Sequence, residues 1–168
     1  MRLFLALLPG PAAVERLTAL QKALLAQGVS GRAVRPENLH MTLAFLGEQD
    51  DPDRVVRALG TLRCAPVCPE MRRLGVFGKA LWVGGGVSPA LQALSDAVRD
   101  RLERGGVAFD QTPFVPHVTL LRGASAAPEG VSVPPFRMRA ARIWLMRSEL
   151  TPGGARYTPL VSFPLEGA

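Results

Sequence analysis

The feature that most constrains this chain is an internal repeat, marked by its only two histidines. His40 and His117 each open the same phrase, His-x-Thr-Leu, and 117 − 40 gives a spacing of 77 residues. At that spacing, the apolar run 3–8 corresponds to 80–85, and the helical pattern 11–27 corresponds to 88–104. The order strand, helix, histidine strand is therefore predicted twice.

Two such units fit one domain, because 168 residues can bury roughly two-thirds of their unfolded surface around one core. The repeat breaks after the second histidine strand, where the short helix predicted after Asp51 corresponds to residues 126–130, which are typical of a loop. The chain closes with two predicted strands, 142–150 and 156–165, joined by the turn Thr151-Pro-Gly-Gly154. We predict a single α+β domain over residues 1–168, with two pseudo-twofold lobes, antiparallel sheets lining a central cleft, and helices outside.

Composition excludes several classes of protein. A hydrophobic content of 48% with 20% charged residues is not that of a disordered chain. The net charge of +6 favours an anionic partner, although an arginine-rich soluble surface gives the same balance. Cys64 and Cys68 are too few for a disulfide framework, which indicates reduced thiols and a cytoplasmic location. The apolar run 3–8 is too short for a signal peptide or a membrane span, so no membrane contact is expected.

The repeated motif predicts where four polar side chains lie. Residues i and i+2 of a strand share a face, so His40 lies beside Thr42 and His117 beside Thr119. Met41, Leu43 and Phe45 would then face the core. Two such strands facing each other across a cleft place two imidazoles and two hydroxyls around one small volume. One imidazole can accept a proton from an attacking hydroxyl while the other donates to a leaving oxygen, and the threonines can hold phosphate oxygens.

Each motif also has a purely structural interpretation. A single strand histidine beside a threonine is commonly a hydrogen-bonded packing residue, and the repetition argues against that interpretation. Two histidines without acidic or cysteine ligands make a poor transition-metal site. Gly84-Gly-Gly86 lacks the lysine and spacing of a phosphate-binding loop and is interpreted as a turn. The tryptophans, Trp82 and Trp144, lie in predicted strands and are assigned to core packing, whereas Phe114 lies close enough to His117 to stack on a base.

The paired motifs resemble the two-histidine (2H) phosphoesterase superfamily, and in particular the RNA 2′,3′-cyclic phosphodiesterases, also called 2′-5′ RNA ligases. The likeness extends over nearly the full chain, and residues 124–135 are the segment that it does not cover. It includes the segment Arg35 to Gly47, the phrase Pro116-His-Val-Thr-Leu120, and the ending Arg147 to Tyr157.

The resemblance implies hydrolysis of RNA 2′,3′-cyclic phosphate ends to 2′-phosphates without metal or cofactor, and ATP-independent 2′-5′ ligation as the reverse reaction. It implies that His40 donates a proton to the departing 3′ oxygen and that His117 activates water, with the roles exchanged in ligation. Arg122 resembles the family's phosphate-binding arginine. Strict strand alternation points Arg122 away from His117, so a bulge or strand end must intervene. Phe114 and Arg147 complete the predicted substrate-binding residues.

The predicted partner is RNA with 2′,3′-cyclic phosphate ends, similar to tRNA halves. Two other functions stay open at this point: a non-catalytic RNA or nucleotide binder, and a phosphodiesterase of small cyclic nucleotides. Because the chain already contains a repeat, it has little need of a second copy, and a monomer is expected.

Overall fold

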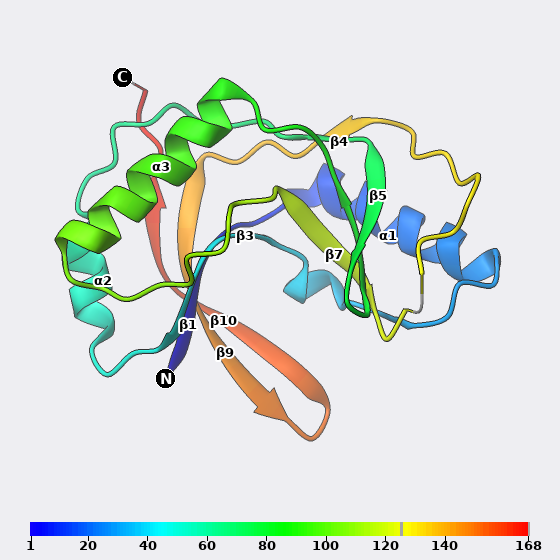
Figure 1. Ribbon diagram of the computed structural model, residues 1–168, viewed down its shortest axis with the longest axis horizontal. Helices are drawn as coiled ribbons and strands as arrows, with labels where there is room; N and C mark the ends of the chain where they lie inside the picture. Colours follow the sequence, from blue (N-terminus) through cyan, green and yellow to red (C-terminus); the bar gives the residue numbers. More distant parts are fainter. Residues whose placement is uncertain (125, 168) are drawn as a thin grey trace.

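The computed structural model describes residues 1–124 and 126–167, and this part of the chain forms three α-helices and three antiparallel sheets (Figure 1). One sheet has the strand order β10-β9-β1-β3, the second has the order β2-β7-β6-β5, and β4 pairs with β8. The elements in chain order are β1 (Arg2–Leu7), α1 (Pro11–Ala26), β2 (Arg32–Ala33), the 3-10 turn η1 (Pro36–Asn38), β3 (Met41–Glu48), α2 (Pro52–Leu59), β4 (Glu70–Met71), β5 (Arg73–Phe77), β6 (Ala80–Gly84), α3 (Pro89–Arg104), β7 (His117–Arg122), β8 (Phe136–Arg137), β9 (Arg142–Thr151) and β10 (Gly154–Pro164).

The predicted repeat is visible in the strand pairing. β1 pairs antiparallel with β3 in the first sheet, and α1 connects the two in the chain. β6 pairs antiparallel with β7 in the second sheet, and α3 connects them. The predicted α+β class, with antiparallel sheets and the strand–helix–histidine strand order in each half, is confirmed.

Two of the helices, α1 and α3, each pack against the sheet of the other half of the chain. α1 follows β1 of the first sheet but packs against β7 of the second, whereas α3 follows β6 of the second sheet and packs against β3 of the first. Figure 1 shows α3 and α2 at one end of the molecule and α1 at the other. Gln21 of α1 is buried and donates hydrogen bonds to the carbonyl oxygens of Val34 (2.8 Å) and Leu120 (2.9 Å). Each lobe therefore buries its apolar face against a helix that belongs to the other half of the chain.

Two helices begin at the caps that the sequence predicts. The Asp51 carboxylate accepts a hydrogen bond from the Asp53 amide at the start of α2, and the Ser88 hydroxyl accepts one from the Leu91 amide at the start of α3. Each cap is followed by proline, whose missing amide proton costs nothing at the first helical position. The start of α3 is thereby held next to the end of β6.

The C-terminal strands β9 and β10 form a long hairpin whose tip projects away from both lobes (Figure 1). Between β7 and β8, residue 124 and residues 126–135 form no helix or strand, while Ser125 lies outside the described residues. No helix in the described ranges combines the length and the apolar character that crossing a membrane requires.

Candidate active site

The His40 ring is held by its own backbone. Its Nδ1 lies 2.7 Å from the carbonyl oxygen of Asn38, so Nδ1 carries the proton and donates it to that carbonyl. The other nitrogen, Nε2, then holds a lone pair and lies 3.0 Å from the Thr42 hydroxyl, which donates to it. The Asn38 amide group donates to the carbonyl of Ala155 on β10, which anchors this turn to the hairpin.

The His117 ring is held in the same way in the other lobe. Its Nδ1 lies 2.7 Å from the carbonyl oxygen of Val115, again two residues before the histidine. Aromatic rings pack against both imidazoles: Phe4 and Tyr157 beside His40, and Phe77 and Trp82 beside His117, with ring centroids 4.9 to 5.6 Å apart. These contacts limit rotation of both rings, and because Nδ1 is bonded to the backbone, Nε2 is the ring nitrogen available to another group.

Both histidine–threonine pairs line one cavity of about 550 Å³, which we call the central cavity. The strands β1 and β3 form one wall, and β7 forms the opposite wall. Its polar lining consists of His40, Thr42, His117, Thr119, Arg122, Arg2, Asp110, Ser148 and Tyr157. The cavity thus has the size of a small-molecule site, about 300–1,000 Å³, and brings the two halves of the repeat together.

Arg122 reaches this cavity because β7 contains an irregularity. The pairing of β6 with β7 shifts between Leu81 and Trp82, so one residue of β7, Leu120, has no partner. Leu120 and Leu121 are both buried as a result, and Arg122 returns to the face that carries His117 and Thr119. The bulge that the sequence analysis required for Arg122 is therefore present.

A similar shift makes one prediction wrong. Phe45 was expected in the core, but its side chain is 54% exposed and lines the central cavity. The register of β1 with β3 shifts twice, once between Leu3 and Phe4 and once between Leu5 and Ala6. Each shift reverses the alternation, so Leu43 and Ala44 are both buried and Phe45 turns outward.

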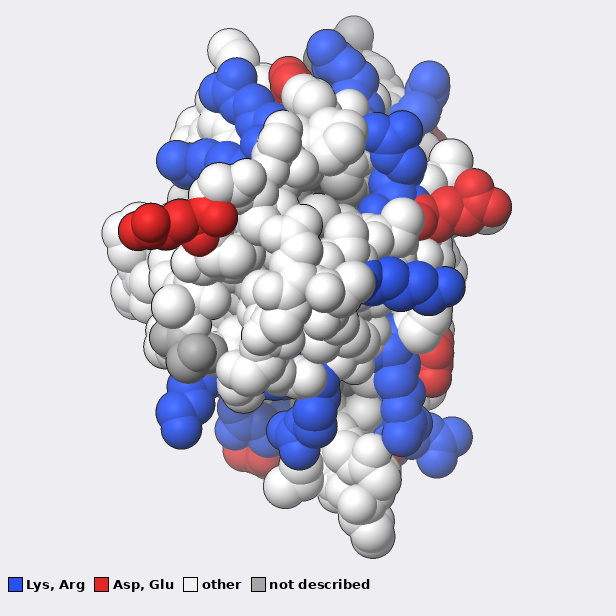
Figure 2. Space-filling model, turned by 90° about the vertical axis from the view of Figure 1, so that its right-hand side faces the viewer, with Lys and Arg blue, Asp and Glu red and all other residues white. Residues whose placement is uncertain are grey.

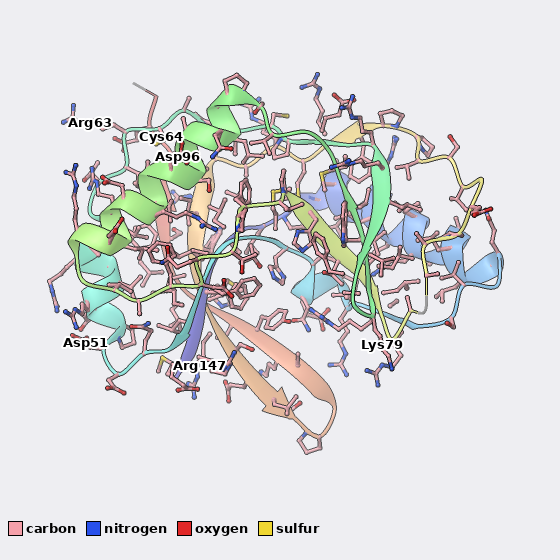
Figure 3. All side chains as sticks on the ribbon, viewed as in Figure 1. Asp51, Arg63, Cys64, Lys79, Asp96 and Arg147 are labelled. Atoms are coloured by element: carbon pink, nitrogen blue, oxygen red, sulfur yellow. The ribbon has the colours of Figure 1, made fainter. Side chains whose placement is uncertain are left out.

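Phe114 and Arg147 take different positions. Phe114 lines a second cavity of about 520 Å³, which we call the aromatic cavity, together with Phe45, Phe77 and His117. Arg147, on β9 (Figure 3), is not part of the central cavity's lining and lies 3.6 Å from the Glu149 carboxylate. Its neighbour Ser148 takes the cavity-facing position of the strand instead. The structure thus places Phe114 in a cavity that His117 also lines, and it does not bring Arg147 to either histidine's cavity.

The surroundings lower the pKa of both histidines. Burial of the ring is the main cause at His40 and lowers its pKa to about 4, with the positive charges of Arg122 and His117 acting in the same direction. Burial also lowers the pKa of His117, and Arg122 adds to the effect. Both imidazoles are therefore neutral at pH 7 in the free protein, each with a lone pair on Nε2.

Sequence reasoning missed several residues of the site. Phe4 and Tyr157 pack at the edge or face of His40, and Tyr157 comes from the last strand of the chain. In the sequence, Phe4 is one apolar residue within a strand of apolar residues, so nothing there indicated that it contacts His40. Trp82 is buried as predicted, although it also packs against His117. Within residues 1–124 and 126–167, no group of three or more His, Cys, Asp or Glu side chains has the geometry of a metal site.

Comparison with known proteins identifies the class to which this fold and site belong. Residues 8–152 match the 2′-5′ RNA ligase superfamily. The chain therefore belongs to that superfamily, and the prediction of an enzyme of this family is confirmed.

Particular relatives cover most of the chain. The RNA 2′,3′-cyclic phosphodiesterase of Escherichia coli K12 is 33% identical in an alignment of 145 residues that covers 81% of this chain and 81% of that protein. The Thermus thermophilus protein of the same name is 32% identical in an alignment of 154 residues that covers 81% of this chain and 76% of that protein. The crystal structure of E. coli LigT in apo form has a TM-score of 0.82 at 30% identity and covers 98% of this chain and 97% of that one. The structure of E. coli LigT complexed with 3′-AMP has a TM-score of 0.81 at 30% identity, again covering 98% and 97%.

Proposed function

We propose that this protein hydrolyses the 2′,3′-cyclic phosphate at the end of an RNA strand to a 2′-phosphate, without a metal ion. One observation carries the proposal: two imidazoles, each with Nδ1 bonded to a backbone carbonyl, line one cavity together with Arg122. The relatives named RNA 2′,3′-cyclic phosphodiesterase act on this chemical group and support the choice of substrate. A 2′-5′ ligation opens the same cyclic phosphate with a different nucleophile and uses the same groups.

In the proposed reaction, Nε2 of His117 takes a proton from water while the water oxygen forms a bond to phosphorus. The bond between phosphorus and the 3′ oxygen breaks, and that oxygen takes a proton from Nε2 of His40. The products are a 2′-phosphate and a 3′-hydroxyl. In ligation, the 5′-hydroxyl of a second RNA replaces water and the same 3′ oxygen departs, so the two histidines keep these roles instead of exchanging them. The guanidinium of Arg122 offers paired donors to the non-bridging phosphate oxygens, and the hydroxyls of Thr42 and Thr119 offer further donors to the charge that grows in the transition state.

The proposal requires one imidazolium and one neutral imidazole at the same time. With its pKa at about 4, His40 is protonated in roughly one molecule in a thousand at pH 7 in the free protein. A bound cyclic phosphate brings a negative charge into the central cavity, and this charge favours the protonated ring and offsets the positive charge of Arg122. Substrate binding therefore supplies the proton donor by raising the pKa of His40.

The test is product analysis of a short RNA with a 2′,3′-cyclic phosphate end, incubated in EDTA with the wild-type protein, His40→Ala or His117→Ala. We expect a 2′-phosphate product with the wild type and at least a thousandfold slower reaction with either variant, on the order of the effect of removing an acid–base residue. Binding without conversion by the wild-type protein refutes the proposal and leaves a binding protein. Conversion of 2′,3′-cyclic AMP but not of the oligomer assigns the activity to small cyclic nucleotides.

The RNA partner with ends like those of tRNA halves belongs to this proposal. The single domain over residues 1–168, the monomeric state and the cytoplasmic location stay predictions.

A further inference from the structure

A third cavity adjoins the central cavity on the side of the β9–β10 hairpin. It has a volume of about 560 Å³, and we call it the hairpin groove. One wall carries Arg32, Arg35 and Arg122, and the other is the hairpin tip, residues 151–155. Arg122 and Tyr157 line both the hairpin groove and the central cavity, so the two spaces meet at these residues.

The charges in the hairpin groove are of one sign. Arg32 and Arg122 are directly opposite each other in the antiparallel pair of β2 and β7, where like charges are destabilising. Arg35 donates to the carbonyl oxygen of Gly153 rather than to a carboxylate. No aspartate or glutamate lines the groove, and none of the three guanidiniums forms an ion pair with any residue in 1–124 or 126–167. This wall therefore carries positive charge that no carboxylate of the described residues neutralises, and it suits an anionic ligand.

We propose that the hairpin groove binds the RNA strand on the 5′ side of the cyclic phosphate, with backbone phosphates against Arg32 and Arg35. The inference rests on the proposed function. An RNA strand carries one negative charge at each linkage, so it can pass from Arg122 to Arg32 without losing contact with a cation. Figure 2 shows Lys and Arg side chains at the lower edge of the molecule, where the hairpin projects, and also along its upper edge.

The aromatic cavity is the less suitable path for that strand. It adjoins the central cavity on the other side, and Phe45, Phe77 and Phe114 give it mostly apolar walls. Its charged lining residues are the Asp110 carboxylate together with Arg99 and Arg122, so unlike the hairpin groove it carries charges of both signs. Such walls favour a nucleobase, because a base stacks on aromatic rings and a phosphate does not. The two cavities thereby divide the substrate into a base on one side and a charged backbone on the other.

The experiment compares two charge reversals of equal size. Arg32→Glu acts in the hairpin groove, while Arg63→Glu acts on the exposed loop after α2, at the opposite end of the molecule (Figure 3). Both side chains are exposed, and both substitutions change the net charge by the same amount. The substrates are 2′,3′-cyclic AMP and a tetranucleotide ending in a 2′,3′-cyclic phosphate. We measure the ratio of kcat/KM for the tetranucleotide to that for 2′,3′-cyclic AMP.

We expect this ratio to fall about tenfold in Arg32→Glu and to keep its wild-type value in Arg63→Glu. We also expect the slope of log(kcat/KM) against log salt for the tetranucleotide to lessen by about 0.7 in Arg32→Ala, as for one lost phosphate contact. An unchanged ratio in Arg32→Glu overturns the proposal and directs the strand to the aromatic cavity. An equal fall of kcat/KM for both substrates in Arg32→Glu also overturns the proposal, because Arg32 then acts on the central cavity through Arg122.

A binding measurement separates this proposal from the proposed function. Fluorescence anisotropy of a labelled tetranucleotide with a 2′-phosphate end needs no turnover. A Kd about tenfold higher in Arg32→Glu than in Arg63→Glu supports the hairpin groove even where no hydrolysis is seen. Equal Kd values in the two variants refute the groove even where the wild-type protein hydrolyses RNA.

Discussion

The partly buried, neutral ring of His40 makes the stability of this protein depend on pH. The folded state binds the His40 proton only near pH 4, whereas the unfolded chain binds it at the ordinary value of 6.5. Between these values the unfolded state holds more protons, so acidification favours unfolding. At pH 7 the ring is neutral in both states, and this contribution to the free energy of unfolding is fully present.

The size of the effect follows from the difference of 2.5 units between 6.5 and about 4. At 1.36 kcal/mol per unit, and with the ring half protonated at pH 4, the loss between pH 7 and pH 4 is about 3 kcal/mol. That is a large share of the 5–15 kcal/mol that stabilises a typical domain. Urea unfolding at the two pH values measures it.

The matched variant is His40→Gln, which keeps a polar side chain and does not titrate. Acidification protonates carboxylates in both proteins, so the difference between wild type and variant isolates the histidine. We expect the wild type to lose about 3 kcal/mol more than His40→Gln between pH 7 and pH 4. Equal losses in the two proteins refute the reasoning, because they mean that the ring at position 40 is as easily protonated in the folded state as in the unfolded chain.

Three further predictions concern the reaction and the junction between the lobes. The kcat/KM for cyclic phosphate ends is expected to be highest at acidic pH and to fall steadily as the pH rises to 8, since the pKa of both histidines is lowered and the free protein then lacks an imidazolium; a plateau up to pH 8 contradicts this. Arg122→Lys is expected to lower kcat/KM about tenfold and Arg122→Ala about a hundredfold, because lysine keeps the charge without the paired donors; equal rates in the two variants speak against bidentate binding. Gln21→Leu is expected to reduce the free energy of unfolding by about 1–3 kcal/mol, because it removes the donor to two buried carbonyls; an unchanged urea midpoint shows that this link between α1 and the second sheet is dispensable.

Periodicity and capping predicted most elements of the fold. The apolar spacing of α3 and its start at Ser88–Pro89 could be predicted from the sequence, because both depend on interactions within a few residues. The sheet against which each helix packs could not be predicted, since α1 and α3 have similar apolar faces and either sheet can bury either helix. Only the packing of the whole chain decides which sheet each helix covers.

The candidate site was predicted in part for the same reason. His40, Thr42, His117 and Thr119 share faces through strict alternation, which a sequence shows directly. Phe45 and Arg122 depend on bulges in β3 and β7, and a bulge reverses the alternation without leaving a local signal. Tyr157 reaches His40 only through the pairing of β9 with both β1 and β10. A contact between segments as far apart in the sequence as His40 and Tyr157 cannot be predicted from either segment alone.

The duplication also raises a chemical problem that the surroundings of the two rings address. A repeated motif supplies two copies of one group, whereas acid–base catalysis needs a proton donor and an acceptor with different proton affinities. His40 is the more deeply buried ring, its Nε2 receives the Thr42 hydroxyl at 3.0 Å, and both Arg122 and His117 oppose its protonation. His117 is less buried and is opposed by Arg122 alone among these charges. We therefore expect a negative phosphate in the central cavity to raise the pKa of His40 more than that of His117. The reason is that His40 is less accessible to water, so the phosphate charge acts on it more strongly. Two identical side chains can in this way respond unequally to one substrate, which is what the proposed division of roles requires.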